Sequence, residues 1–232
     1  AATSSKGIYV HKDDSFEKST IVKGSDLYTM ARVGDQLFVS TNLENILFDG
    51  SNVSFMGKGF PNAKVRDVFT GNGKSWYAAE NKIIQKNKNS YVSKSVEFPS
   101  TKIKIQALLV VGDVEYFGTN QGLWSRTGKG DLKLLKNINV LCLDQLQSGD
   151  ILVGSKKGLY YFSSGRLKQY RPSGDEHAAL NNTPIRGIDV ISASEVWYST
   201  FGMGLYLHDP GTFITVGSAD GLDTGGMVYD LA

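Results

Sequence analysis

The sequence lacks the features that mark disulfide-bonded, membrane-spanning and nucleic-acid-binding proteins. It has 232 residues and one cysteine, Cys142, so an internal disulfide is excluded. No apolar run approaches the about 18 residues that a membrane helix requires, which excludes membrane insertion by a helix. The 25 basic residues nearly balance the 23 acidic ones, so the net charge does not favour binding of nucleic acid. The first residues, AATSSKG, lack the charged and apolar regions of a signal peptide.

Residues suited to turns and strands are plentiful. There are 26 glycines, and aromatic residues make up 11% of the chain. Glycine permits tight turns, and aromatic residues favour strands. No convincing helical periodicity interrupts this pattern, so the composition indicates an all-β fold.

One phrase recurs along the chain: an apolar pair, a small residue, Ser, Thr or Ala, a short polar loop, and an apolar strand. It reads FVSTNLENILF at 38–48, YFGTNQGLWS at 116–125 and WYSTFGMGLYL at 197–207. The first apolar residue after the loop recurs every 36 to 46 residues, at Ile8, Ile46, Ile83, Leu123, Leu159 and Leu205. An all-β repeat of this length is typical of propeller blades.

Each copy is predicted to form four short antiparallel strands. An apolar segment and a tight turn precede the phrase, and a second turn and a short strand follow it. The whole chain, 1–232, is then one β-propeller domain with blade repeats at 27–57, 65–98, 105–136, 140–171 and 185–216.

The two ends of the sequence are predicted to share a further blade. Residues 227–232 have the pattern of a first strand, and residues 1–22 supply the others, including a last strand at 20–22. The join is about six residues short of a perfect repeat. Six blades with one shared blade is therefore the main prediction, and a fragment of a seven-bladed or larger propeller is the alternative.

The segment 183–231, with VWYST, GLYLHDP, FITV and ADGL, resembles the two-component regulator propeller repeat. LVGSKKGLYYFSSGRLKQY and YFGTNQGLWS resemble it as well. The resemblance implies an extracytoplasmic, bacterial sensor domain in the periplasm or outside the cell. It implies a non-enzymatic role in signal transduction, in which the propeller binds a small polar ligand, such as a carbohydrate, or a protein partner, which includes a second copy of the chain.

Two other functions stay open. A propeller lyase or glycoside-processing enzyme would bring residues together from several blades, and a structural scaffold would bind proteins only. No catalytic motif and no cofactor motif is found. The three histidines, His11, His177 and His208, lie in different repeats at no metal-ligand spacing, so no metal site is expected.

A ligand site is expected on the face where the loops between the second and third strands meet the connections between blades. The longest connection, 171–184, accounts for the widest repeat spacing, and long loops on a rigid scaffold tend to carry function. The candidate residues are Asn42, Glu80, Asn120, Gln121, Lys156, Asp175, Glu176, His177, Asn181, Asn182, Phe201 and Met203. Phe201 and Met203 are unusually apolar for such a loop and are candidates for stacking on a sugar or a partner.

Overall fold

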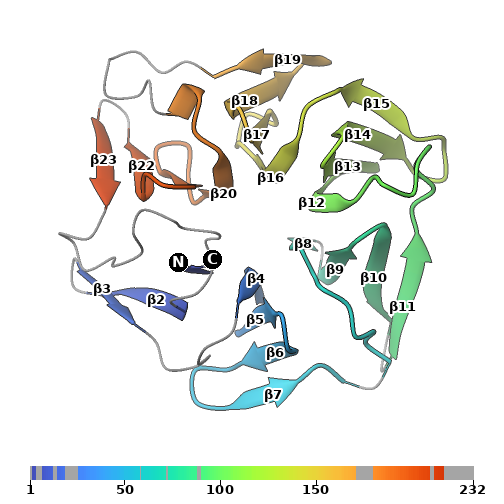
Figure 1. Ribbon diagram of the computed structural model, residues 1–232, viewed down its shortest axis with the longest axis vertical. Helices are drawn as coiled ribbons and strands as arrows, with labels where there is room; N and C mark the ends of the chain where they lie inside the picture. Colours follow the sequence, from blue (N-terminus) through green and yellow to red (C-terminus); the bar gives the residue numbers. More distant parts are fainter. Residues whose placement is uncertain are drawn as a thin grey trace.

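The computed structural model is a ring of antiparallel sheets around a central axis (Figure 1). It describes residues 2–3, 7–12, 15–18, 26–57, 59–71, 73–87, 90–170, 180–209 and 212–216. Among them only the backbone is described for residue 87, for 208–216, and for the strands before residue 26 except at Ile8. Five of the sheets have four strands and one has three, so the prediction of an all-β propeller with four-stranded antiparallel blades is confirmed for five blades.

Chain order gives the position of every strand in its blade, from the centre outward. Blade 1 contains β4 (Leu27–Val33), β5 (Gln36–Thr41), β6 (Asn45–Phe48) and β7 (Val53–Phe55). Blade 2 contains β8 (Asp67–Gly71), β9 (Lys74–Ala79), β10 (Lys82–Asn87) and β11 (Ser90–Ser95). Blade 3 contains β12 (Ile105–Val111), β13 (Val114–Thr119), β14 (Gly122–Thr127) and β15 (Lys133–Lys136). Blade 4 contains β16 (Val140–Gln145), β17 (Ile151–Ser155), β18 (Gly158–Ser163) and β19 (Arg166–Gln169). Blade 5 contains β20 (Ile185–Val190), β21 (Val196–Thr200), β22 (Leu205–Asp209) and β23 (Thr212–Val216).

The three-stranded sheet is formed by β1 (Ala2–Thr3), β2 (Gly7–Lys12) and β3 (Ser15–Lys18). It lies between blades 5 and 1 (Figure 1), and Ile8 packs on blade 1 beside Leu27 and Ile46. The structure thus has a strand at 15–18, whereas the last strand of this blade was expected at 20–22. Both 20–22 and 227–232 lie outside the described residues, so the shared sixth blade stays a prediction.

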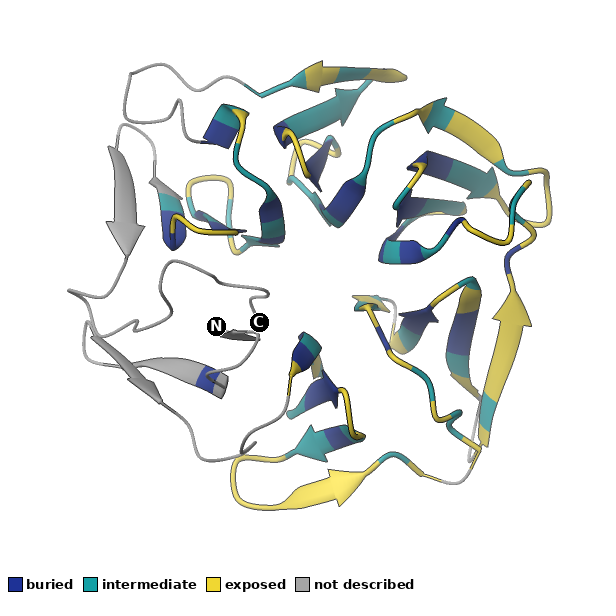
Figure 2. Ribbon diagram, in the orientation of Figure 1, coloured by how far each residue is buried: buried dark blue, intermediate teal, exposed yellow. Residues whose placement is uncertain are grey.

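Separate apolar cores lie between successive blades from blade 1 to blade 5. Phe38 of blade 1 is fully buried and makes an edge-on contact with Tyr77 of blade 2, with ring centroids 5.1 Å apart. Phe117 of blade 3 and Leu152 of blade 4 lie in two further cores of the same kind. Burial decreases from the inner strands to the outer ones (Figure 2), as expected when a sheet buries both faces against its neighbours.

The small residue of the repeated phrase lies where neighbouring blades approach most closely. It is buried in every one of the five blades, as Ser40, Ala78, Gly118, Gly154 and Ser199. At Gly118 a methyl group would lie 2.5 Å from Cγ1 of Val140 in the next blade. The spacing between blades therefore explains why the repeat requires a small residue here.

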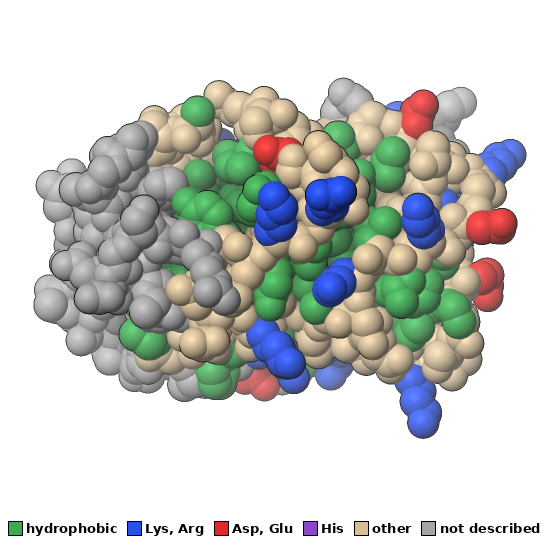
Figure 3. Space-filling view, turned by 90° about the horizontal axis from the view of Figure 1, so that it is seen from above, with side chains coloured by type: hydrophobic (Ala, Val, Ile, Leu, Met, Phe, Trp, Pro, Cys, Tyr) green, Lys and Arg blue, Asp and Glu red, His purple; other side chains and the backbone are tan. Residues whose placement is uncertain are grey.

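The outer edge of the disc is more mixed in character. Figure 3 views the ring from the side and shows Lys and Arg side chains beside patches of hydrophobic ones. Exposed apolar residues on the outermost strands include Val53, Phe55, Val92 and Leu134. In the described part of the chain, no helix is long and apolar enough to cross a membrane.

Candidate functional site: the upper face and the central channel

The loops between the second and third strands, the B–C loops, are closed by a hydroxyl group in blades 1, 3, 4 and 5. In blade 3 the Thr119 hydroxyl donates to the carbonyl oxygen of Gly122 at 2.8 Å and accepts from the Gln121 N–H at 3.1 Å. Equivalent bonds are made by Thr41, Ser155 and Thr200. Such side-chain bonds hold a short loop in one conformation. We call the face that carries these loops the upper face.

Five of the predicted ligand-binding residues share one repeat position, directly after the hydroxyl residue or its counterpart, Ala79. They are Asn42, Glu80, Asn120, Lys156 and Phe201. In blades 1, 3, 4 and 5, backbone bonds join this position to the segment that leads into the inner strand of the same blade, for example from Phe201 N to Pro184 O at 3.0 Å. The B–C loop and the start of the inner strand therefore lie together on the upper face.

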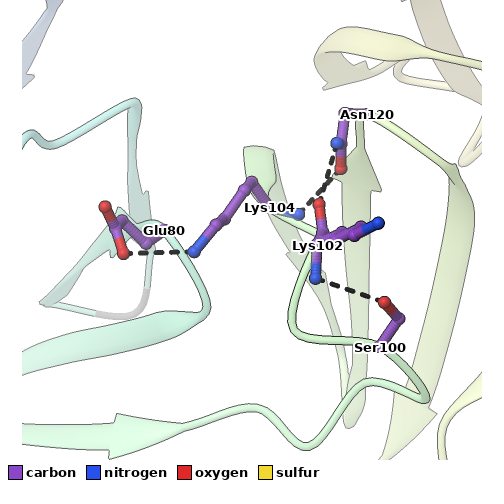
Figure 4. A network of polar contacts seen from close by, with 5 residues as sticks. All are labelled: Glu80, Ser100, Lys102, Lys104 and Asn120. Atoms are coloured by element: carbon purple, nitrogen blue, oxygen red, sulfur yellow. Dashed lines mark hydrogen bonds and ion pairs between the residues drawn. The ribbon is translucent and has the colours of Figure 1, made fainter.

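Two of these residues use their side chains to hold that junction. The Asn120 carboxamide accepts from Lys104 N at 2.7 Å and donates to Lys102 O at 3.0 Å (Figure 4). Asn42 accepts from Asp26 N at 3.1 Å in the same way. Both amides thus have a structural role, and ligand binding by them stays a prediction.

Glu80 is joined to the same network from the neighbouring blade. Its Oε2 lies 3.2 Å from Nζ of Lys104 (Figure 4). Both side chains are largely exposed, at 66% and 45%, so this ion pair contributes little to stability. Among the described residues, Glu80 is the one carboxylate that was predicted to bind a ligand, and the ion pair neutralises its charge.

The remaining candidates are scattered over the upper face. Gln121, Lys156, Asn182 and Met203 are exposed, whereas Asn181 is half-buried and accepts a bond from Gln169 Nε2 at 2.7 Å through its carbonyl. Asp175, Glu176 and His177 lie outside the described residues.

A channel runs through the centre of the ring and has a volume of about 710 Å³. The inner strands β4, β8, β12, β16 and β20 surround it (Figure 1), and residues from all of them line it. This volume lies within the range of small-molecule sites. The described structure therefore places a cavity of ligand size between the inner strands of the blades.

A β-bulge at the start of each inner strand gives the channel a ring of side chains near the upper face. The register shifts at this point in four blades, and in blade 2 both Arg66 N and Asp67 are paired with Ala78. A bulge turns the extra side chain out of the regular alternation. The bulged residues, which we call the upper ring, are Tyr28, Arg66, Gln106, Leu141 and Arg186, and all line the channel.

Cations and aromatic rings meet around this upper ring. The guanidinium of Arg66 lies 4.6 Å from the centre of the Tyr28 ring, and the ammonium of Lys64 lies 5.0 Å from it. In blade 5, the guanidinium of Arg186 lies 5.5 Å from the centre of the Phe201 ring. Phe201 is thus a predicted candidate that directly contacts a residue of the upper ring.

Carboxylates of the inner strands mainly tie blades together. Asp67 accepts from Leu108 N at 2.6 Å, and Asp144 accepts from Val190 N at 2.8 Å, each across a blade boundary. Burial raises the pKa of Asp144 to about 6, and the nearby Asp189 charge adds to this, while two backbone N–H groups oppose it. Burial, with the Glu195 charge, also raises the pKa of Asp189. Asp144 and Asp189 lie toward the far end of the inner strands from the upper face, whereas Asp67 lies at the start of β8, beside the upper ring.

Sequence reasoning missed the upper ring because it considered loops only. The available signal was the residue that follows the first buried position of each inner segment, where Tyr28, Arg66, Gln106 and Arg186 each follow a buried apolar residue. Without the bulge, simple alternation would not have identified these side chains as channel-lining.

Comparisons with known proteins agree with the propeller fold. No protein-family model matches the sequence, and no curated protein matches it. Among solved structures, the extracellular domain of the putative hybrid two-component system BT4673 from B. thetaiotaomicron is similar, with a TM-score of 0.60 and 16% identity. The match covers 84% of this chain and 28% of that one, so the chain spans less than a third of that structure.

Two further propellers show the range of proteins with this fold. A virginiamycin B lyase from Staphylococcus aureus, solved with quinupristin, has a TM-score of 0.61 and 10% identity, over 90% of this chain and 73% of that one. YCF48 bound to a peptide has a TM-score of 0.54 and 11% identity, over 85% and 70%. At these identities the likeness establishes the fold alone. The neighbours from a two-component system agree with the repeat family that the sequence resembles.

Proposed function

We propose that the chain is a non-enzymatic recognition domain of an extracytoplasmic bacterial sensor. The observation that carries this proposal is the channel of about 710 Å³ on the inner strands, whose upper ring presents polar and aromatic side chains. Sites of this kind are concave, largely preformed and have a few polar groups. The resemblance to extracellular domains of a two-component system supports the sensor role and the extracytoplasmic location.

The partner in this proposal is a small polar ligand or a segment of another protein, bound at the upper face. The peptide-bound propeller among the neighbours supports the second kind of partner. Apolar residues are exposed on the outer strands, such as Phe55, whose exposed fraction is 68%, so a second copy of the chain is a further candidate partner.

We also propose that the ring has six blades, the sixth formed by β1 to β3 and residues 227–232. The position of the three-stranded sheet between blades 5 and 1 supports this closure (Figure 1). Sharing a blade between the two ends joins them across the ring and leaves fewer unpaired edges.

The lyase among the neighbours favours an enzyme as the second candidate function. Several carboxylates already have partners within the protein, which favours the non-enzymatic recognition domain. Glu80 is in an ion pair, while Asp67 and Asp144 accept backbone N–H groups between blades. In the part of the chain that the structure describes, no group of three or more His, Cys, Asp and Glu residues could hold a metal ion.

Binding and turnover should be measured on the same samples. The chain would be titrated by calorimetry with neutral and charged oligosaccharides and peptides, and it would be used to capture proteins from a periplasmic extract. The proposal predicts saturable binding without chemical change in the ligand. Turnover of a bound compound would favour the enzyme, and silence in both assays would overturn the recognition role.

A further inference from the structure

Two cations at the channel mouth converge on one aromatic ring. Lys64 and Arg66 both lie against the Tyr28 ring, at 5.0 Å and 4.6 Å from its centre, so their charged groups are less than 10 Å apart. Both side chains are exposed. The tyrosine ring attracts each cation but carries no net charge, so it does not neutralise the pair.

Neither cation has a carboxylate partner within the described part of the chain. Asp26 lines the same end of the channel, yet no ion pair joins it to Lys64 or Arg66. The adjacent Asp67 is directed to backbone N–H groups of Val68 and Leu108. By contrast, Lys104 on the same face is paired with Glu80. Lys64 and Arg66 therefore form a local positive charge that no described carboxylate pairs with.

A third cation lies across the channel. Arg186 lines it from blade 5, while Arg66 lines it from blade 2, and β20 and β8 lie on opposite sides of the axis in Figure 1. Gln106, between them on the ring, donates to Asn139 Oδ1 and Val140 O, both at 2.9 Å, and so supports the wall. An arginine presents a planar fork of donors that matches a carboxylate, sulfate or phosphate.

We propose that the upper ring binds a small molecule through an oxyanion, a carboxylate, sulfate or phosphate, held by Arg66 and Lys64. This inference rests on the recognition role proposed above and specifies its ligand class. The body of the ligand extends into the channel toward Arg186, against the rings of Tyr28 and Phe201. Buried apolar residues such as Leu108 and Leu141 form part of the lining. The ligand is thus an acid with a carbon skeleton of monosaccharide or disaccharide size.

Pairs of probes that differ only in charge test this assignment. The intact chain would be titrated by calorimetry, at matched ionic strength, with D-glucuronate against D-glucose, and with glucose 6-phosphate against inorganic phosphate. We expect the anionic sugars to bind and glucose to bind about tenfold more weakly or not at all, because charge-assisted hydrogen bonds are lost. Binding of inorganic phosphate as tight as that of glucose 6-phosphate would show that the oxyanion alone supplies the affinity, which also supports the oxyanion site.

Variants then locate the site. Arg66→Gln and Lys64→Gln should each weaken binding of the anionic probe about tenfold, while Lys157→Gln, an exposed lysine on a B–C loop, should leave it unchanged. Tyr28→Phe keeps the ring and should retain binding, whereas Tyr28→Leu removes it and should not. Thermal unfolding of each variant would check that the fold is intact.

The results that would overturn the inference differ from those that would overturn the recognition role. Equal binding of glucose and glucuronate, or full binding by Arg66→Gln and Lys64→Gln together, would reject the oxyanion site but keep a recognition domain. Binding of no probe would also reject the site, and only an empty periplasmic capture in addition would reject the recognition role.

Discussion

Replacing Phe38 by alanine should remove a large part of the stability of the ring. Phe38 is fully buried between blades 1 and 2 and packs against Tyr77, at 5.1 Å between ring centroids, and Phe60, at 6.4 Å. Truncating a buried phenylalanine costs about 3–5 kcal/mol, through lost burial and the cavity that remains. This cost includes the loss of the edge-on aromatic contact, which is worth about 0.5–1.5 kcal/mol. The total is a large share of the about 5–15 kcal/mol that stabilises a typical domain.

Phe55→Ala is the matched control, since it makes the same chemical change on the outer strand β7. Phe55 is 68% exposed, and we expect a change within about 0.5 kcal/mol. Urea unfolding followed by circular dichroism would give the free energy of unfolding of both variants and of the unmodified chain. Equal losses in the two variants would refute the packing of blade 1 on blade 2 through Phe38.

Three further outcomes follow from the described contacts. The pKa of Asp144 is raised to about 6 from 3.8, so the folded state binds more protons than the unfolded state between these pH values, and the contribution of Asp144 to the free energy of unfolding should fall by about 3 kcal/mol as the pH rises from about 4 to 6. Asp144→Asn should remove this part of the pH dependence measured by urea unfolding. Parallel pH profiles of the variant and the unmodified chain would contradict it. Gly118→Val should destabilise the chain by at least about 1–3 kcal/mol because its side chain meets Val140, and a thermal unfolding midpoint equal to that of the unmodified chain would contradict this. Thr119→Val should cost about 1–2 kcal/mol by opening the B–C loop of blade 3, and unchanged amide exchange at Gln121 would argue against that role.

The sequence predicted the blades because the signal for them is local and repeated. The small residue and the hydroxyl residue of the phrase, such as Gly118 and Thr119, meet the same packing and loop requirements in successive blades. A requirement that recurs at a fixed interval is visible without any knowledge of long-range contacts. The strand at 15–18 lies earlier in the chain than the strand expected at 20–22.

The candidate site was predicted only in part, and the reason is geometric. Loop residues such as Phe201 could be placed on the upper face from the repeat alone. The positions of Tyr28, Arg66 and Arg186 depend on a bulge at the start of each inner strand, and on five blades meeting at one axis. Both are long-range properties, and the residue types at this repeat position differ from blade to blade, so the repeat alone does not identify these residues as channel-lining.

The most direct test of a recognition site at the channel mouth is a nuclear magnetic resonance titration that follows backbone amides and arginine side chains together. D-Glucuronate would be added to the intact chain, and the changes in chemical shift would be mapped onto the ring. The account predicts that the largest changes occur at Tyr28, Arg66, Arg186 and Phe201, with small changes on the outer strands β7 and β11. Changes confined to the outer strands, or to the lower end near Asp144 and Asp189, would contradict it.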